Sequence, residues 1–419
     1  MKRRIQTLDE KSATKNESDK FADYRSDYLF LLIGTNPLPN YVVYHLLAKP
    51  SSHIIFVHTS KTDQIANNLI TVLNIPSERW TKISVDESNS RDIYTKIFEY
   101  SKGKQKLGLN YTGGTKAMAV HAYKAVLDSN PDSVFSYLDA RSLELVIDER
   151  DSSSKRVPVS LSVKPTIQEL FSLHGYRIDN KREVFMPEIC EVLANDLFVE
   201  FRKWCDEKLR SKDLGKILNK RELGKILNKR ELKNVILPVD PPFENLANFW
   251  EGCNTLGELA EKWEFGGASR KMEKKVKNLA EWFDGNWLED YTLLAFLEVA
   301  EECKIHDHIL GAKFNNGKFE VDVAVLRGYE LFVISCTTAI NKSLVKQKLF
   351  EAYVRGQQLG GDEAKIGVVC FASETSPDAS PEIIKKEIEE EWHLENKFRV
   401  FGAEQIPNLS LCLKEWLTS

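Results

Sequence analysis

The stretch that decides the fold runs from Lys106 to Lys116 and reads KLGLNYTGGTK. Its first half is an apolar run of strand length, and its second half, TGGT, opens the helical pattern KAMAVHAYKAVL. Two adjacent glycines let the backbone approach a ligand closely, and the first turn of a helix offers free N–H donors to an anion. The stretch predicts a strand–loop–helix unit whose loop suits a phosphate, although a plain strand-to-helix turn would use the same two glycines.

Similar units precede and follow this stretch. Apolar runs of strand length lie at Tyr28–Ile33, His53–His58 and Trp80–Val85, each followed by a stretch with helical spacing, and Ser133–Asp139 begins a closing pair of edge strands. Alternation of strands and helices with short loops is typical of a doubly wound, mostly parallel sheet. In such sheets ligands bind at the carboxyl ends of the strands, which is where the TGGT loop falls.

The length of 419 residues is too great for one ordinary core and predicts two or three domains. We expect a polar leader at 1–24, the first α/β domain at 25–155, a helical, winged-helix-like connector at 156–275 and a second α/β domain at 276–419. The second domain is predicted from a long helix, the strands FEVDVAVL and ELFVISC, a further helix and the strand KIGVVCF.

Charge and cysteine content exclude several classes of protein. Lys and Arg number 58 against 62 Asp and Glu, a formal net charge of −4, which excludes a chain coated in basic residues. Seven cysteines lie at least fifteen residues apart, which excludes a CxxC metal knuckle and indicates buried thiols in a reducing cytoplasm. No secretory signal and no apolar run of membrane-spanning length is present, so we expect a cytoplasmic protein without a membrane partner.

The connector contains a local excess of positive charge. Residues 202–234 carry twelve Lys or Arg against five Asp or Glu, and the nine-residue segment GKILNKREL occurs twice in succession over 215–232. Such a segment is either a solvated helical face or an arm that contacts nucleic acid.

Two segments of the first domain, GTNPLPNY at 34–41 and NYTGGTKAM at 110–118, resemble the CARF (CRISPR-associated Rossmann fold) sensors. More narrowly, they resemble the CARF–nuclease effectors of type III CRISPR systems. The resemblance implies a homodimer that binds a cyclic oligoadenylate across its two-fold axis, with cyclic tetra-adenylate as the expected ring. The residues that the resemblance assigns to the ligand are Thr35, Asn36, Pro37, Thr59, Ser60, Thr112, Gly113, Gly114, Thr115 and Lys116.

The second domain, with Glu289 on its leading helix and Asp322 on a strand, resembles the PD-(D/E)XK restriction-endonuclease-like fold. The resemblance implies cleavage of single-stranded DNA, supercoiled DNA or RNA with Mg²⁺ or Mn²⁺ held by clustered carboxylates. The family's usual Glu-x-Lys on the next strand is replaced by Ser335-Cys336-Thr337.

Two interpretations of this replacement compete: the nuclease is inactive, or the missing groups have moved to the following helix. On that helix Lys348 and Glu351 are spaced i,i+3 and share one face. The active interpretation predicts the catalytic set Glu289, Asp322, Ser335, Thr337, Lys348 and Glu351, with the metal ion on Glu289, Asp322 and Glu351.

The alternatives to this nuclease differ in class. One is a catalytically inactive sensor that passes the signal of the cyclic oligoadenylate to a partner, and another is a ligand-responsive regulator that binds nucleic acid through the basic connector. A third possibility is that the first domain cleaves its own cyclic ligand.

Overall fold

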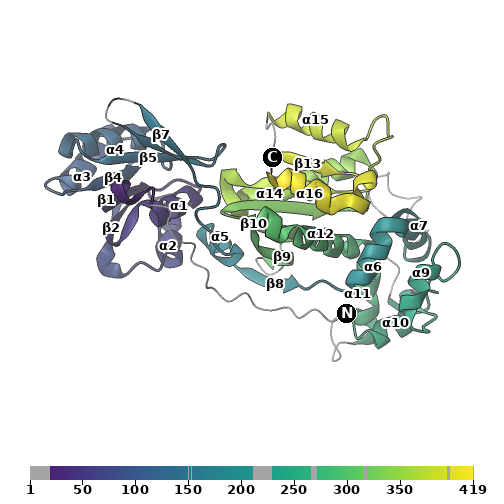
Figure 1. The fold of residues 1–419 in the computed structure, drawn as a ribbon. Coiled ribbons are helices and arrows are strands. Elements are labelled where there is room, and N and C mark those ends of the chain that lie inside the picture. The colour runs from purple at the N-terminus through teal and green to yellow at the C-terminus, as the bar shows by residue number, and fades with distance from the viewer. Residues whose placement is uncertain are drawn as a thin grey trace.

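The computed structural model describes residues 19–149, 151, 153–210, 229–265, 271–314, 317, 319–393 and 397–418. Two β-sheets form separate units along the chain, and a group of helices packs at the far end of the second sheet (Figure 1). Among the described residues, no helix has the length and apolar character needed to cross a bilayer.

The first sheet has seven strands in the order β3-β2-β1-β4-β5-β6-β7. The pairs from β3 to β5 are parallel, β6 pairs antiparallel with β5, and β7 pairs antiparallel with β6, as predicted for a doubly wound sheet with closing edge strands. The strands are β1 Ser26–Leu32, β2 Ala48–His58, β3 Trp80–Ser84, β4 Leu107–Asn110, β5 Val134–Asp139, β6 Glu144–Asp148 and β7 Ser154–Pro158. The helices between them are α1 Leu38–Leu47, α2 Asp63–Val72, α3 Ser90–Ser101 and α4 Lys116–Ser129.

The continuous apolar runs of this sheet are explained by burial on both faces. Leu29, Phe30, Leu31 and Leu32 of β1 are all fully buried, which is the pattern of a parallel strand covered by helices on each side. The Thr115 hydroxyl accepts a hydrogen bond from the Met118 N–H, so the last residue of the TGGT loop is the N-cap of helix α4.

The second sheet has six strands in the order β13-β12-β11-β10-β9-β8, parallel from β11 to β13 and antiparallel from β8 to β11. The α/β fold predicted for the last third of the chain is confirmed. The strands are β8 Ile178–Arg182, β9 Ile305–Phe314, β10 Phe319–Arg327, β11 Glu330–Cys336, β12 Lys365–Val369 and β13 Phe398–Phe401. The main helices are α12 Trp287–Glu298, α14 Lys342–Gly360, α15 Pro381–Trp392 and α16 Leu409–Thr418, and α13 spans Ala300–Cys303.

Strand β8 differs from the sequence-based expectation, which placed only helices between 156 and 275. Its residues, IDNKR, pair with β9, so the second sheet begins before the helical segment. The strand is polar and largely exposed because it lies at the edge of the sheet, and it therefore lacks the apolar alternation that reveals a strand in a sequence.

The helical segment packs against the second sheet. It consists of α6 Pro187–Val192, α7 Phe198–Lys208, α8 Lys229–Lys233, α9 Glu244–Ala247, α10 Leu256–Lys262 and α11 Met272–Glu281. Trp250, Trp282 and Phe283 are buried in one apolar core that continues onto α12 and the strands beneath it. Most of the duplicated segment 215–232 lies outside the described residues, so its role as a nucleic-acid arm and the winged-helix-like character stay predictions.

Helix α5, Ile167–Leu173, joins the two sheets. Its apolar residues belong to a core that contains side chains of both sheets, and the Phe171 ring lies 5.4 Å from the Phe314 ring of β9. The Ile167 N–H donates a 2.7 Å hydrogen bond to Asp307, also on β9. In Figure 1, α5 lies between the two sheet units.

Candidate functional site

The first candidate site lies at the point where the strand order of the first sheet reverses. The chain leaves β1 toward β2 on one side, while β4 pairs with β1 on the other. The loops Ile33–Pro37 and Tyr111–Thr115 therefore leave neighbouring strands at the same edge. Such a topological switch point is the usual ligand crevice of an open α/β sheet.

The backbones of these two loops approach each other closely. A Cβ on Gly34 would lie 2.9 Å from the Gly114 nitrogen, and a Cβ on Gly113 would collide with the Leu32 carbonyl oxygen. Gly114 has a φ of 75°, a conformation that favours glycine. These glycines are therefore needed for the turn and for the close approach of the two loops.

The predicted ligand residues differ in what they offer to a ligand. The side chains of Thr35, Ser60 and Lys116 are exposed, whereas Pro37 and Thr59 are buried. Several hydroxyls already have partners: Thr112 Oγ1 accepts a 2.7 Å hydrogen bond from the Leu138 N–H, and Thr59 Oγ1 accepts one of 3.2 Å from the Lys61 N–H. The side chains free to meet a ligand are those of Thr35, Ser60 and Lys116.

Asn36 has a role that the sequence did not reveal. Its Nδ2 donates a 2.8 Å hydrogen bond to Glu363 Oε2 in the second domain, and its Oδ1 accepts from the Leu38 N–H at 3.1 Å. Asn36 thus links the crevice loop to the second domain.

The second candidate site is a cavity of about 370 Å³ between β10, β11 and α14. Four of the six predicted catalytic residues line it: Asp322 of β10, Ser335 of β11, and Lys348 and Glu351 of α14. The structure therefore brings the proposed migrated pair to the same cavity as Asp322. Thr337 does not line the cavity; its N–H donates to the Val369 carbonyl, and its hydroxyl accepts a hydrogen bond from the Ala339 N–H.

The polar groups of this cavity are largely paired with one another. Asp322 Oδ2 accepts 2.8 Å hydrogen bonds from Ser335 Oγ and from the Cys336 N–H. Lys348 Nζ lies 3.5 Å from Glu351, and these two side chains are 44% and 50% exposed. Ser335 thus donates to the carboxylate of Asp322, and the Lys348–Glu351 pair is solvent-accessible at the rim.

Glu289 lies behind Asp322 and is paired with an arginine. Arg182 of β8 contacts Glu289 Oε2 at 2.6 Å and Asp290 Oδ1 at 2.7 Å. Burial and the neighbouring Asp322 raise the pKa of Glu289 to about 8, against the opposing effect of Arg182. Glu289 therefore lies within electrostatic reach of Asp322, with the guanidinium of Arg182 beside it.

The residues as arranged do not fit a divalent ion. Among the described residues, no three His, Cys, Asp or Glu side chains are placed to hold a metal ion together. Arg182 pairs with Glu289 Oε2, and both hydrogen bonds to Asp322 go to its Oδ2, so each carboxylate has one oxygen already engaged. Mg²⁺ and Mn²⁺ need several free oxygen ligands, so the metal set Glu289, Asp322 and Glu351 stays a prediction from the sequence.

Residues 29–164 match the family model described as the Card1 CARF domain. The predicted resemblance to the CARF sensors is confirmed. The match covers the first sheet from Leu29 of β1 onward, including the loops after β1, β2 and β4 and the closing hairpin. No curated protein matches the chain.

Two solved structures share the fold of nearly the whole chain. Can2 from Sulfobacillus thermosulfidooxidans, in complex with cyclic tetra-adenylate, is 17% identical with a TM-score of 0.66, and the match covers 94% of this chain and 100% of that one. Protein VC1899 from Vibrio cholerae is 16% identical with a TM-score of 0.64, with coverage of 93% and 98%. At these identities the likeness shows the fold alone, with one α/β domain followed by another.

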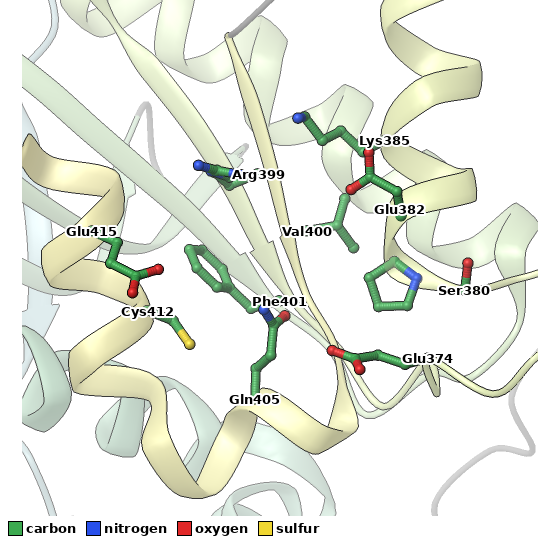
Figure 2. A pocket seen from close by; sticks show the side chains of 11 residues that line it. Glu374, Ser380, Glu382, Lys385, Arg399, Val400, Phe401, Gln405, Cys412 and Glu415 are labelled. Carbon is green, nitrogen blue, oxygen red and sulfur yellow. The ribbon is translucent and has the colours of Figure 1, made fainter. Parts of the chain in front are cut away.

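A further cavity of about 310 Å³ lies on the opposite edge of the second sheet, beside β13. Figure 2 shows Glu415 and Cys412 of α16 on one side of it and Glu382 and Lys385 of α15 on the other. Its charged side chains are nearly balanced, three acidic and two basic, so it favours neither an anion nor a cation.

Proposed function

We propose that this protein is an effector of type III CRISPR defence that binds a cyclic oligoadenylate in the crevice of its CARF domain. The observation that carries the proposal is the direct backbone contact between the loops after β1 and β4, at the switch point of a sheet that matches the Card1 CARF model. Can2, which shares the fold, is described in complex with cyclic tetra-adenylate, and this supports the same ring as the ligand here.

The chemistry of the crevice suits a ring of phosphodiesters. Backbone N–H groups of the two loops, the hydroxyls of Thr35 and Ser60 and the ammonium of Lys116 all favour negatively charged oxygens. Lys116 also stands at the N-terminus of α4, where the helix dipole favours an anion. A homodimer would present two such crevices to one ring, as the family resemblance implies.

Calorimetric titration with cyclic tetra-adenylate tests this part of the proposal. Lys116→Ala is expected to weaken binding by about tenfold, because one charged hydrogen bond contributes roughly 1.5 kcal/mol. The matched control is Lys124→Ala, an exposed lysine further along α4. Equal affinity in both variants and in the wild type, or no binding at all, contradicts the assignment of the crevice.

The second domain is proposed to act on the phosphodiester backbone of DNA or RNA at the cavity that contains Asp322. Lys348 and Arg355 line this cavity and supply positive charge for a phosphate, while Ser335 positions the carboxylate of Asp322. Cleavage of single-stranded DNA, supercoiled DNA and RNA is measured with and without cyclic tetra-adenylate, in Mg²⁺, Mn²⁺ or chelator. Asp322→Ala is expected to abolish cleavage while ligand binding remains.

A second candidate function is a sensor without nuclease activity that passes the signal to a partner. The hydrogen bonds that Ser335 and Cys336 donate to Asp322, and the pairing of Glu289 with Arg182, favour it because they leave few free catalytic groups. The two functions separate in the same assay. Wild-type protein that binds the ring but cleaves no substrate under any ionic condition supports the sensor, and cleavage that depends on Asp322 excludes it.

A further inference from the structure

Arg182 occupies the centre of the acidic cluster in the second domain. Its two terminal nitrogens divide between two carboxylates, Glu289 and Asp290, at 2.6 and 2.7 Å. The Asp290 side chain is completely buried and also accepts hydrogen bonds from Trp282 Nε1 and the Phe185 N–H. The guanidinium is therefore tied into a network that belongs to the interior of the protein.

The neighbouring backbone leaves room for this arginine. Gly311 on β9 has a φ of 56°, and a Cβ there would lie 2.7 Å from Arg182 Nε and 2.9 Å from its Cγ. Any larger residue would push the arginine stem out of its position. Arg182 Nε is shielded from solvent and has no hydrogen-bond partner among the described residues, so the two terminal nitrogens make all its contacts with the cluster.

The same cluster reaches Asp322. Glu289 interacts electrostatically with Asp322, and Cys336 lies between that strand and α12 because its N–H donates to Asp322 while its sulfur lies 3.4 Å from Thr292 Oγ1. One guanidinium, two carboxylates bound to it and a third carboxylate nearby thus form a compact charged group under the cavity.

We propose that Arg182 is the resident cation of this cluster and excludes a divalent ion from it. A guanidinium stays charged at every physiological pH, so it cannot give way to a metal ion by losing a proton. Arg182 holds one oxygen of Glu289 and one of Asp290 in charge-assisted hydrogen bonds, and its fixed positive charge repels a divalent ion from the carboxylate oxygens that remain. The wild-type site is therefore selective against Mg²⁺ and Mn²⁺ and offers a fixed positive charge instead.

Arg182 would exclude a divalent ion from this cluster whether or not the second domain cleaves nucleic acid as proposed above. If cleavage occurs, it is expected to persist in chelator. The conclusion rests on the second domain alone, so failure of the CARF assignment does not affect it, and titration with cyclic tetra-adenylate measures that assignment separately.

The test is direct titration of the full chain with Mn²⁺, following free Mn²⁺ by electron paramagnetic resonance. The wild type is expected to show no stoichiometric site. Arg182→Met removes the charge and keeps much of the apolar stem, and it is expected to tighten Mn²⁺ binding by about tenfold or more. Adding Asp322→Asn to this variant is expected to return the Mn²⁺ affinity to that of the wild type.

Two further variants keep the test decisive. Arg182→Lys keeps a positive charge, but a single ammonium group cannot bridge Glu289 and Asp290 as the two guanidinium nitrogens do. An increase in Mn²⁺ affinity smaller than that of Arg182→Met is therefore expected. Arg202→Gln is the matched control, since Arg202 also pairs with a carboxylate, Asp284, outside this cluster, and no gain is expected. Thermal unfolding identifies the variants that fold. Stoichiometric Mn²⁺ binding by the wild type that is lost in Asp322→Asn, or folded Arg182 variants without any gain, overturns the proposal.

Discussion

Replacement of Glu363 by glutamine is expected to change how the stability of the protein depends on pH. Glu363 ends a short 3-10 turn, Gly361–Glu363, and is only 2% exposed. Its Oε2 accepts the hydrogen bond from Asn36, while its Oε1 has no partner among the described residues. Burial raises the pKa of this carboxyl from 4.5 to about 7, against the smaller opposing effect of the Asn36 hydrogen bond.

The sign and size of the effect follow from this pKa. Because the folded state holds the proton more tightly than the unfolded state, the native protein loses stability as the pH rises from about 4.5 through about 7. At about 1.36 kcal/mol per pKa unit, the full loss is of the order of 3 kcal/mol. Glutamine cannot ionise, but its amide nitrogen lacks a partner, which costs about 1 kcal/mol. Glu363→Gln is therefore expected to destabilise the protein at acidic pH and to stabilise it by about 2 kcal/mol above about pH 8.

The assay is thermal unfolding of wild type and variant between about pH 5 and about pH 8.5, where the two curves should cross. Glu390→Gln, at an exposed position of α15, is the matched control and should follow the wild type throughout. Parallel curves for Glu363→Gln and the wild type would refute the reasoning, since they would mean that Glu363 titrates equally in the folded and unfolded states.

Three other changes test different parts of the structure. Asn36→Ala leaves Glu363 buried without its partner, and at about pH 8 it should lower the unfolding free energy, measured in urea, by about 1–3 kcal/mol. Gly113→Ala brings a methyl group against the Leu32 carbonyl and should separate the crevice loops, so calorimetry should show at least about tenfold weaker binding of cyclic tetra-adenylate. Burial lowers the pKa of His174 from 6.5 to about 4, so native stability falls as the pH drops through this interval. In His174→Gln, the melting temperature should fall less than in the wild type as the pH is lowered from about 6.5 to about 4.

The elements that could be predicted are those whose own residues are apolar. The runs of β1, β2 and β4 and the TGGT loop identify a doubly wound sheet because a parallel strand buried on both faces needs an unbroken apolar sequence. The cavity in the second domain was also predictable in part, since Lys348 and Glu351 occupy one face of a helix that follows the strand after Asp322.

The residues that escaped prediction depend on tertiary contacts. β8 is polar because it lies at an edge, and Arg182 stands in it beside Lys181 with nothing in the sequence to distinguish the two. Only the pairing of β8 with β9 brings Arg182 to Glu289, more than a hundred residues later. Likewise, the partner of Asn36 lies 327 residues away, at a position that no local pattern marks.

The Asn36–Glu363 hydrogen bond has a consequence for the relation between the two domains. Asn36 stands in the loop after β1, between the crevice residue Thr35 and the first turn of α1, and its amide is the partner of a carboxylate buried in the second domain. Movement of this loop away from Glu363 would leave that carboxylate without a hydrogen bond, at a cost of about 1–3 kcal/mol. A ligand that shifts the loop must supply this free energy from its own contacts, whereas a ligand that leaves the loop in place does not. The crevice and the second domain are therefore energetically linked at one partly buried contact, and the ligand's effect on the second domain depends on whether that contact survives binding.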